Sequence, residues 1–238
     1  MLPGPEDSLL TLDEQKEVAT VFRAKRSWMN LAERELRTFD TFLTPQEAGW
    51  ADEEYQNAVR KPRGDLENEK TLLENEYRAM KRHGVRWVEK VLSGEPTRGF
   101  VLRGIPGDGK SHLAKAVGWE LIRARVDFKY IDWPVFLQGM RDCIGDDELD
   151  EKEDFMDPAL KAGVIIADDF GAHKASEWAE ERCFMLLSRW INNRIPVLMT
   201  MNIGAGKMEE AFGSRNDSRI HELGIIWDCP NLDWRRRK

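Results

Sequence analysis

The sequence predicts an α/β fold in which a doubly wound parallel sheet follows a small all-helical domain. From residue 99 onward, apolar runs of strand length alternate with longer helix-like segments, a pattern typical of a parallel sheet. A glycine-rich loop lies directly between one such run and a helix-like segment. Residues 1–92, in contrast, carry their apolar side chains at helical spacing. We therefore expect two domains, residues 1–92 and residues 93–238.

Three helices and a linker are predicted in the first domain. Residues 11–39 and 44–60 each begin with Thr followed three positions later by Glu, the capping-box pattern, and Pro45 suits the first helical position. A third helix is predicted over residues 65–83, with Gly84 as its C-cap. A short amphipathic helix over residues 85–92 should then lead into the second domain.

The second domain is expected to alternate strands and helices after a turn cluster at residues 93–99. Strands are predicted at residues 100–102, 128–131, 164–169 and 196–202, with a strand-like run at 225–227. Helices are predicted at residues 113–122, 133–141 and 176–193, with a further helical stretch from about residue 207.

The glycine-rich loop is a candidate phosphate-binding site. Residues 104–111 read Gly-Ile-Pro-Gly-Asp-Gly-Lys-Ser, which satisfies G-x-x-x-x-G-K-[ST] between a strand and a helix. Backbone N–H groups of such a loop bind phosphate oxygens, while the lysine reaches the β- and γ-phosphates and the serine hydroxyl holds Mg²⁺. The predicted ligand is a triphosphate. The predicted nucleotide-binding residues are Gly104, Ile105, Pro106, Gly107, Asp108, Gly109, Lys110, Ser111 and His112.

A second motif, the apolar run that ends in Asp168 and Asp169, is interpreted as a Walker B strand. The carboxyl end of a parallel strand would place Asp168 beside Ser111, so that both hold Mg²⁺, and Asp169 would orient the attacking water. Taken alone, the run could equally be a buried strand followed by an acidic turn. The upstream phosphate-binding loop favours the Walker B interpretation.

The net charge of −7 does not exclude nucleic acid, because the acidity is local. Residues 142–157 hold nine acidic side chains and one basic one, which leaves the rest of the chain near neutral. Basic clusters at residues 60–63, at 78–86 and in the tail at 235–238 could contact phosphates, although such clusters are usually solvated faces.

No apolar run is long enough to cross a membrane, and the N-terminus lacks the pattern of a signal peptide. We therefore expect a cytoplasmic protein without a membrane partner. Cys143, Cys183 and Cys229 are far apart in the sequence and form no C-x-x-C pair, which indicates free thiols.

Four segments together resemble the AAA+ ATPases of the DnaC/IstB-like group, most of all the replicative helicase loaders. They are residues 104–114, 165–171, 200–202 and 218–220, and the resemblance extends over about residues 99–235. It implies that Asn202 is the sensor that contacts the γ-phosphate or attacking water. It also implies that Arg219 is the finger donated to a neighbouring subunit's ATP, with Arg215 as the alternative.

The sequence departs from the wider AAA+ pattern in three respects. Most of these ATPases have Glu where this chain has Asp169, so hydrolysis is expected to be slow and switch-like. Few residues follow Arg219, so we expect no C-terminal helical lid, as in the loader group. The N-terminal segment also lacks the cysteine-rich zinc module of some loaders.

The resemblance implies an ATPase that uses ATP and Mg²⁺, associates with itself through its core, and acts in DNA replication. The leading hypothesis is a loader that binds a hexameric replicative helicase through its N-terminal helices and single-stranded DNA through its AAA+ core, and that loads one onto the other. The alternatives are an IstB-like transposition helper that acts on duplex DNA with a transposase, and an ATP switch that only scaffolds other proteins.

Overall fold

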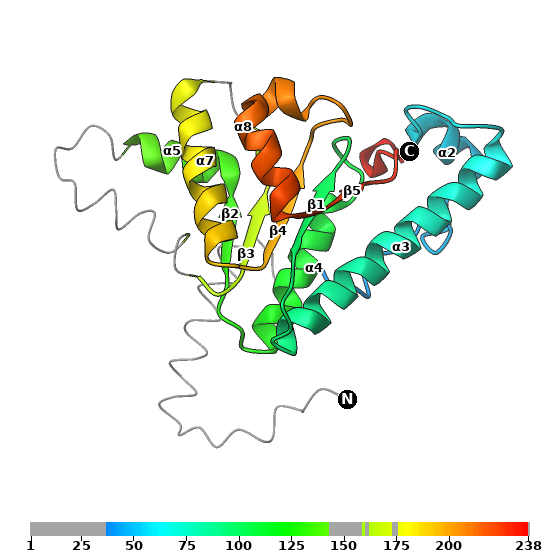
Figure 1. Cartoon of the computed structure of the whole chain (residues 1–238). Helices are drawn as coiled ribbons and strands as arrows, with labels where there is room; N and C mark the ends of the chain where they lie inside the picture. The colour runs from blue at the N-terminus through cyan, green and yellow to red at the C-terminus, as the bar shows by residue number, and fades with distance from the viewer. Residues whose placement is uncertain (1–36, 143–158, 160–161, 173–175, 238) are drawn as a thin grey trace, which may run out of the picture. The chain divides into compact units, whose positions relative to one another are not determined.

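The computed structural model describes residues 37–142, 159, 162–172 and 176–237 (Figure 1). The helices in these ranges include α2 (Asp52–Ala58), α3 (Leu66–Leu92), α4 (Lys110–Arg123), α5 (Trp133–Asp142), α7 (Glu177–Asn192), α8 (Met208–Leu223) and a final 3-10 turn, η1 (Trp234–Arg236). The strands are β1 (Gly99–Arg103), β2 (Lys129–Asp132), β3 (Ile165–Asp168), β4 (Val197–Met201) and β5 (Gly224–Asp228).

The five strands form one parallel sheet in the order β2-β3-β4-β1-β5. In its register Phe100 of β1 lies between Leu198 of β4 and Ile225 of β5. The predicted α/β class and parallel sheet are therefore confirmed. Because β4 separates β1 from β3, the loops after these three strands meet at one edge of the sheet, where α/β proteins bind their ligands.

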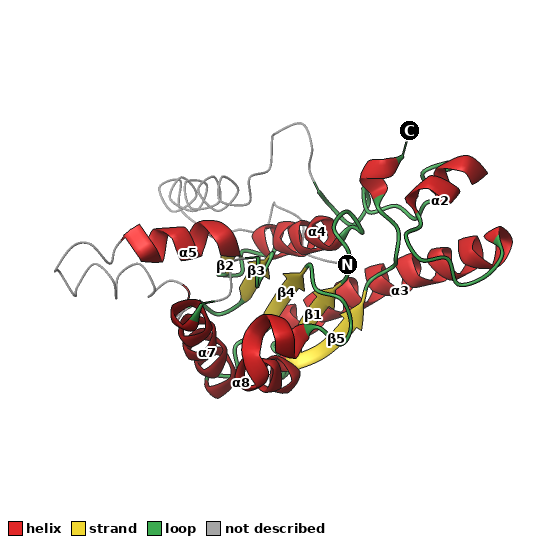
Figure 2. Cartoon of the chain, turned by 90° about the horizontal axis from the view of Figure 1, so that it is seen from above, coloured by secondary structure: helices red, strands yellow, loops and turns green. Residues whose placement is uncertain are grey.

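Helices cover both faces of the sheet, which explains why its central strands are apolar throughout. Figure 2 shows α4 on one side of the strands, and α7 and α8 on the other. Every residue of β3 and β4 is buried, as expected for a parallel sheet covered on two faces. Large side chains fill the layer beneath α7 and α8, among them Trp133, Phe170, Trp190 and Phe212.

The prediction that Gly84 ends a helix is wrong, because α3 is one continuous helix of 27 residues. Asp65 caps its N-terminus by accepting a hydrogen bond from the N–H of Asn68 at 2.9 Å. Gly84 lies in its interior, where a Cβ atom would come within 3.0 Å of Leu113 Cδ1 on α4. The glycine thus permits close packing of α3 on α4.

The helix predicted over residues 44–60 is also interrupted. The capping box forms, since Thr44 N–H donates to Glu47 Oε2 at 2.9 Å and Glu47 N–H donates to Thr44 Oγ1 at 3.1 Å. Only one turn follows, because Gly49 adopts a left-handed conformation with φ of +69°, and α2 starts at Asp52. The helix predicted over residues 11–39 lies outside the described residues except for its last three, which are not helical.

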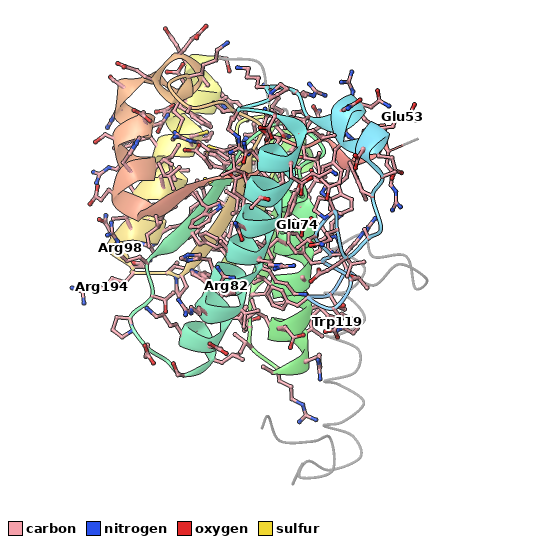
Figure 3. All side chains as sticks on the ribbon, turned by 90° about the vertical axis from the view of Figure 1, so that its right-hand side faces the viewer. Glu53, Glu74, Arg82, Arg98, Trp119 and Arg194 are labelled. Atoms are coloured by element: carbon pink, nitrogen blue, oxygen red, sulfur yellow. The ribbon has the colours of Figure 1, made fainter. Side chains whose placement is uncertain are left out.

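The turn at residues 44–49 and α2 pack against α3. Glu74, labelled on α3 in Figure 3, accepts hydrogen bonds from Gln46 N–H at 2.6 Å and from the Tyr55 hydroxyl at 3.1 Å. The described residues belong to one compact unit that starts at Arg37. No break in this unit coincides with residue 92, so a division of function at that position stays a prediction.

Two further sequence features can be located only in part. The acidic segment at residues 142–157 and Cys143 lie outside the described residues, apart from Asp142 at the end of α5. Cys183 and Cys229 are free, and Cys183 is buried. None of the helices that the structure describes has the length and apolar character needed to cross a membrane.

Candidate nucleotide site

A cleft of about 550 Å³ opens at the sheet edge where β1 and β4 end. One wall is the phosphate-binding loop with the start of α4, and Asp169 and Asn202 lie beside it. The opposite wall is formed by segments from both ends of the described chain, which contribute Thr41, Phe42, Leu43, Trp234 and Arg235. The predicted loop and two of the catalytic candidates, Asp169 and Asn202, thus share one cavity.

The backbone of the loop requires glycine at two positions. Gly107 and Gly109 have φ angles of +89° and +96°, in the left-handed region that other residues avoid. Gly109 immediately precedes α4, so the first N–H groups of that helix, which lack partners within it, face the loop. An anion held here would meet both these N–H groups and the positive end of the helix dipole.

Lys110 points into the loop. Its side chain is only 3% exposed, and Nζ donates to the Ile105 carbonyl at 2.7 Å and to the two Asp108 carboxylate oxygens at 2.7 and 2.9 Å. Asp108 is itself buried, and this burial raises its pKa, although Lys110 opposes the rise. The sequence located Asp108 in the loop but gave no sign that its carboxylate pairs with the lysine.

Ser111 and Asp168 are brought together as predicted: Ser111 Oγ donates to Asp168 Oδ1 at 2.9 Å. A hydroxyl and a carboxylate side by side are hard oxygen ligands that fit Mg²⁺. Two residues that the sequence analysis missed orient this carboxylate, because the Tyr130 and Thr200 hydroxyls each donate to it at 2.5 Å. They lie on β2 and β4, which flank β3, so strand order is the signal that would have identified them.

Asp169 and Asn202 also meet at the cleft. Asn202 Nδ2 donates to Asp169 Oδ1 at 2.7 Å, and the Asp169 N–H donates to Thr200 Oγ1 at 2.9 Å. Asp169 has a left-handed φ of +55°, which turns its side chain away from the direction of β3. Burial and the neighbouring charge of Asp168 raise the pKa of Asp169, which makes it a better proton acceptor once ionised.

His112 contributes to an aromatic corner of the cleft. Its Nε2 lies 3.1 Å from Thr41 Oγ1, and its ring packs edge-on against Phe42 at 5.3 Å between centroids. Burial lowers the pKa of His112 to about 4, so the ring is neutral at physiological pH. A neutral aromatic surface beside a phosphate-binding loop suits the base of a nucleotide. The sequence analysis had not assigned Thr41 or Phe42 to the site.

The two candidate finger arginines do not reach this cleft. Arg215 and Arg219 project from α8, where their guanidinium groups lie 3.4 and 5.5 Å from the Phe184 ring centroid. Arg219 Nη1 also pairs with Glu222 Oε2 at 2.6 Å. They therefore lie apart from the nucleotide site of their own subunit, and a role toward a neighbouring subunit stays a prediction.

The basic tail lies at the phosphate-binding loop, which the sequence did not reveal. The Trp234 N–H donates to the Gly107 carbonyl at 2.9 Å, and Arg235 and Arg237 line the cleft. The cluster at residues 60–63 is also engaged within the protein, because Arg60 pairs with Asp233 at 2.8 Å and Arg63 with Glu69 at 2.8 Å. Arg60 and Arg63 are therefore paired with the protein's own carboxylates, and the tail packs against the loop.

Known proteins share both the sequence pattern and the fold. The chain is 29% identical over 142 residues to YqaM of Bacillus subtilis, an uncharacterized protein, covering 56% of this chain and 42% of YqaM. It is 23% identical over 134 residues to the replicative helicase loader DnaC of Escherichia coli, covering 56% and 54%. The chain thus spans about half the length of these curated relatives.

Among solved structures, the crystal structure of the DnaC helicase loader superposes with a TM-score of 0.56 at 16% identity. The match covers 75% of this chain and 99% of that one. The crystal structure of DnaI gives a TM-score of 0.53 at 18% identity, covering 76% and 95%. These likenesses show that the chain shares the fold of DnaC and DnaI. The model of the IstB-like ATP binding proteins matches residues 17–219, a span that contains the phosphate-binding loop, the Asp168–Asp169 pair and Arg219. The chain therefore belongs to the IstB-like ATP-binding family.

Proposed function

We propose that the protein is an ATPase of DNA replication that binds a ring-shaped replicative helicase and transfers it to single-stranded DNA. The observation that carries the ATPase proposal is the convergence of Lys110, Ser111, Asp168, Asp169 and Asn202 at one edge of the sheet. The replication role is supported by the shared fold with the DnaC and DnaI structures and by the similarity to the E. coli loader.

Each residue has a distinct part in the proposed hydrolysis. The loop N–H groups and Lys110 bind the phosphates, and Ser111 and Asp168 hold Mg²⁺, which neutralises charge on the phosphate oxygens. Asp169 accepts a hydrogen bond from the attacking water, and Asn202 fixes the Asp169 carboxylate through its 2.7 Å contact. Because Asp is one methylene shorter than Glu, the water must approach closer to β3, and we expect slow turnover.

The helices that precede α3, within residues 1–92, are proposed to bind the helicase. The sequence analysis assigned DNA to the AAA+ core, and we propose instead a basic stripe on α3 (Leu66–Leu92). Arg78, Arg82 and Arg86 recur there every four residues, and all three are exposed. Figure 3 shows Arg82 on this face of α3. A row of arginines on one helix face suits the backbone of a nucleic acid.

The loader function predicts an ATP-dependent transfer of helicase to DNA. The full chain, a hexameric replicative helicase from the same host, and circular single-stranded DNA coated with single-strand-binding protein would be mixed with or without ATP. We expect ATP to increase the helicase retained on DNA by about tenfold or more, since the nucleotide switch drives each transfer. Retention that is the same without the protein would contradict the loader function.

A transposition helper remains the second candidate, because the matching family model is named for IstB. The two functions differ in the DNA that they require, which is single-stranded for a loader and duplex for a transposition helper.

Replacing Arg78, Arg82 and Arg86 by Ala should reduce the slope of log affinity against log salt for single strands by about 2, at roughly 0.7 for each phosphate that is no longer neutralised. The control is the double variant Arg98→Ala/Arg194→Ala, which removes two exposed arginines outside α3. It should leave the slope unchanged. Tighter binding of duplex than of single strands would favour the transposition helper.

Self-association through the core gives a further prediction. Arg219→Ala should leave ATP affinity within about twofold of the wild type, because Arg219 lies outside the cleft of its own subunit. It should lower hydrolysis by about 1000-fold if it acts as a finger on a neighbour. Mixing Arg219→Ala with Lys110→Ala protein should restore part of the phosphate release, because some interfaces then pair an intact loop with an intact arginine.

Arg215→Ala should be tested in the same experiment, because Arg215 is the alternative candidate for the finger. If neither substitution slows hydrolysis and turnover per molecule does not depend on protein concentration, the ATPase is monomeric and the proposed finger is wrong.

A further inference from the structure

We propose that a second cavity, beside α3, binds one amino-bearing base of single-stranded DNA. This inference rests on the proposed binding of single strands and adds a base-reading site to it. The cavity has a volume of about 400 Å³ and lies between α3 and the segment that contains the turn at residues 44–49 and α2. This volume is in the range of pockets that hold small ligands. In the described part of the chain, its lining residues are all different from those of the nucleotide cleft.

Two buried polar groups of this cavity have no hydrogen-bond partner. Trp50 and Glu74 both line it, and each is only 8% exposed. Among the described residues, Glu74 Oε2 has no donor and Trp50 Nε1 has no acceptor. Buried polar groups in folded proteins are nearly always paired. These two therefore indicate a ligand that brings a donor for the carboxylate and an acceptor for the indole N–H.

The Glu74 carboxylate is held in one orientation by its other oxygen. Oε1 accepts hydrogen bonds from Gln46 N–H at 2.6 Å and from the Tyr55 hydroxyl at 3.1 Å. Oε2 is therefore the oxygen that remains for a ligand. Tyr55 also packs edge-on against Trp50, with 5.6 Å between ring centroids. One residue thus contacts both side chains that carry the unpaired groups.

The hydrogen-bonding edge of a nucleic-acid base supplies the missing partners. In cytosine and adenine an amino group, which donates, lies beside a ring nitrogen that accepts. The Glu74 carboxylate can only accept and the Trp50 indole can only donate, and a carboxylate is a known partner of the cytosine amino group. Thymine has no amino group, and its ring N–H lies between two carbonyl oxygens that a carboxylate repels. The pair therefore favours amino-bearing bases over thymine.

The cavity lies at one end of the arginine stripe on α3. Arg78 is a member of the stripe and also lines the cavity. Figure 3 shows Glu74 and Arg82 on α3, each about one helical turn from Arg78. A strand whose phosphates follow the stripe can thus insert a base into the cavity. Acidic charge at the rim is offset, because Lys70 pairs with Glu67 at 3.6 Å.

The test measures the affinity of the full chain for fluorescently labelled dC and dT oligonucleotides of about 12 nucleotides, a length that covers a typical single-strand site. At equal salt the wild type should bind dC about tenfold more tightly than dT. Glu74→Gln should abolish this preference, since its amide oxygen can keep the contacts to Gln46 and Tyr55 while an NH₂ group replaces the unpaired oxygen. Trp50→Phe keeps an aromatic ring and should also reduce the preference. Thermal unfolding of each variant checks that the fold is kept.

Glu53→Gln is the matched control. Glu53, labelled in Figure 3, is exposed on α2 and lies outside the lining residues of the cavity. Both substitutions remove one negative charge, which by itself favours the binding of DNA. Weaker binding of dC by Glu74→Gln alone therefore reports a lost contact. Because this contact is to a base, the slope of log affinity against log salt should stay at its wild-type value.

Two results would overturn the inference: equal affinity of the wild type for dC and dT, or equal behaviour of Glu74→Gln and Glu53→Gln. Either would leave the proposed binding of single strands intact and would show that no base occupies the cavity. If the wild type binds neither oligonucleotide, the proposed single-strand function fails and the base-reading site fails with it.

Discussion

Replacing Lys110 by Ala should reduce ATP affinity by a factor on the order of 100 or more, because it removes the buried ammonium group that meets the phosphates. The structure adds a second effect. Lys110 is the ion-pair partner of buried Asp108, so the single substitution leaves a carboxylate unpaired inside the loop. Removing one partner of a buried pair commonly costs about 3–5 kcal/mol, and part of the loss would then reflect a less stable fold.

A double variant separates these effects. The double variant Lys110→Ala/Asp108→Ala removes both charges, so its unfolding temperature should be closer to that of the wild type than the unfolding temperature of Lys110→Ala is. It should still fail to bind a fluorescent ATP analogue. Lys90→Ala, an exposed lysine near the end of α3, should bind normally. Wild-type affinity in the double variant would show that the loop is not the phosphate site.

Asp169→Asn should bind ATP with nearly wild-type affinity but hydrolyse it at least about 100-fold more slowly. Asn keeps an oxygen that can accept the hydrogen bond from Asn202 Nδ2, so the local geometry should survive. It cannot take up a proton or polarise the water as a carboxylate does, and such groups contribute about 10²–10⁴ to rates. Asp168, held by Tyr130 and Thr200, remains available for the metal.

Single-turnover release of phosphate measures this effect directly, with binding checked in parallel. Asp228→Asn is the matched control, because Asp228 ends the parallel strand β5 at the same edge of the sheet yet pairs with Arg103 outside the cleft. Unchanged turnover in Asp169→Asn would move the water-orienting role to another residue.

Short-range patterns in the sequence were sufficient to predict the strands of the sheet and the phosphate-binding loop. The loop pattern needs only eight consecutive residues between a strand and a helix, and every strand predicted at residues 100–202 forms within two residues of its expected bounds. Gly84 was misread because a helix-ending glycine and a close-packing glycine look alike along the chain. Its role depends on Leu113, which is distant in sequence.

The sequence did not reveal two groups of site residues. One group depends on the order of the strands, and the other on the packing of the C-terminal tail against the phosphate-binding loop. Tyr130 and Thr200 contact Asp168 only because β2 and β4 flank β3. The tail arginines formed an ordinary basic cluster in the sequence, and no local pattern indicated that Trp234 returns to Gly107. Both sets of contacts join residues that are far apart in the sequence, so only the three-dimensional arrangement reveals them.

The buried Asp108–Lys110 pair has a consequence for nucleotide exchange. The Asp108 carboxylate lies 2.7 Å from the Lys110 ammonium group, which is the group expected to bind a phosphate. A phosphate that binds Lys110 must therefore share this cation with an anion that belongs to the protein. We expect this competition to shorten the lifetime of bound nucleotide.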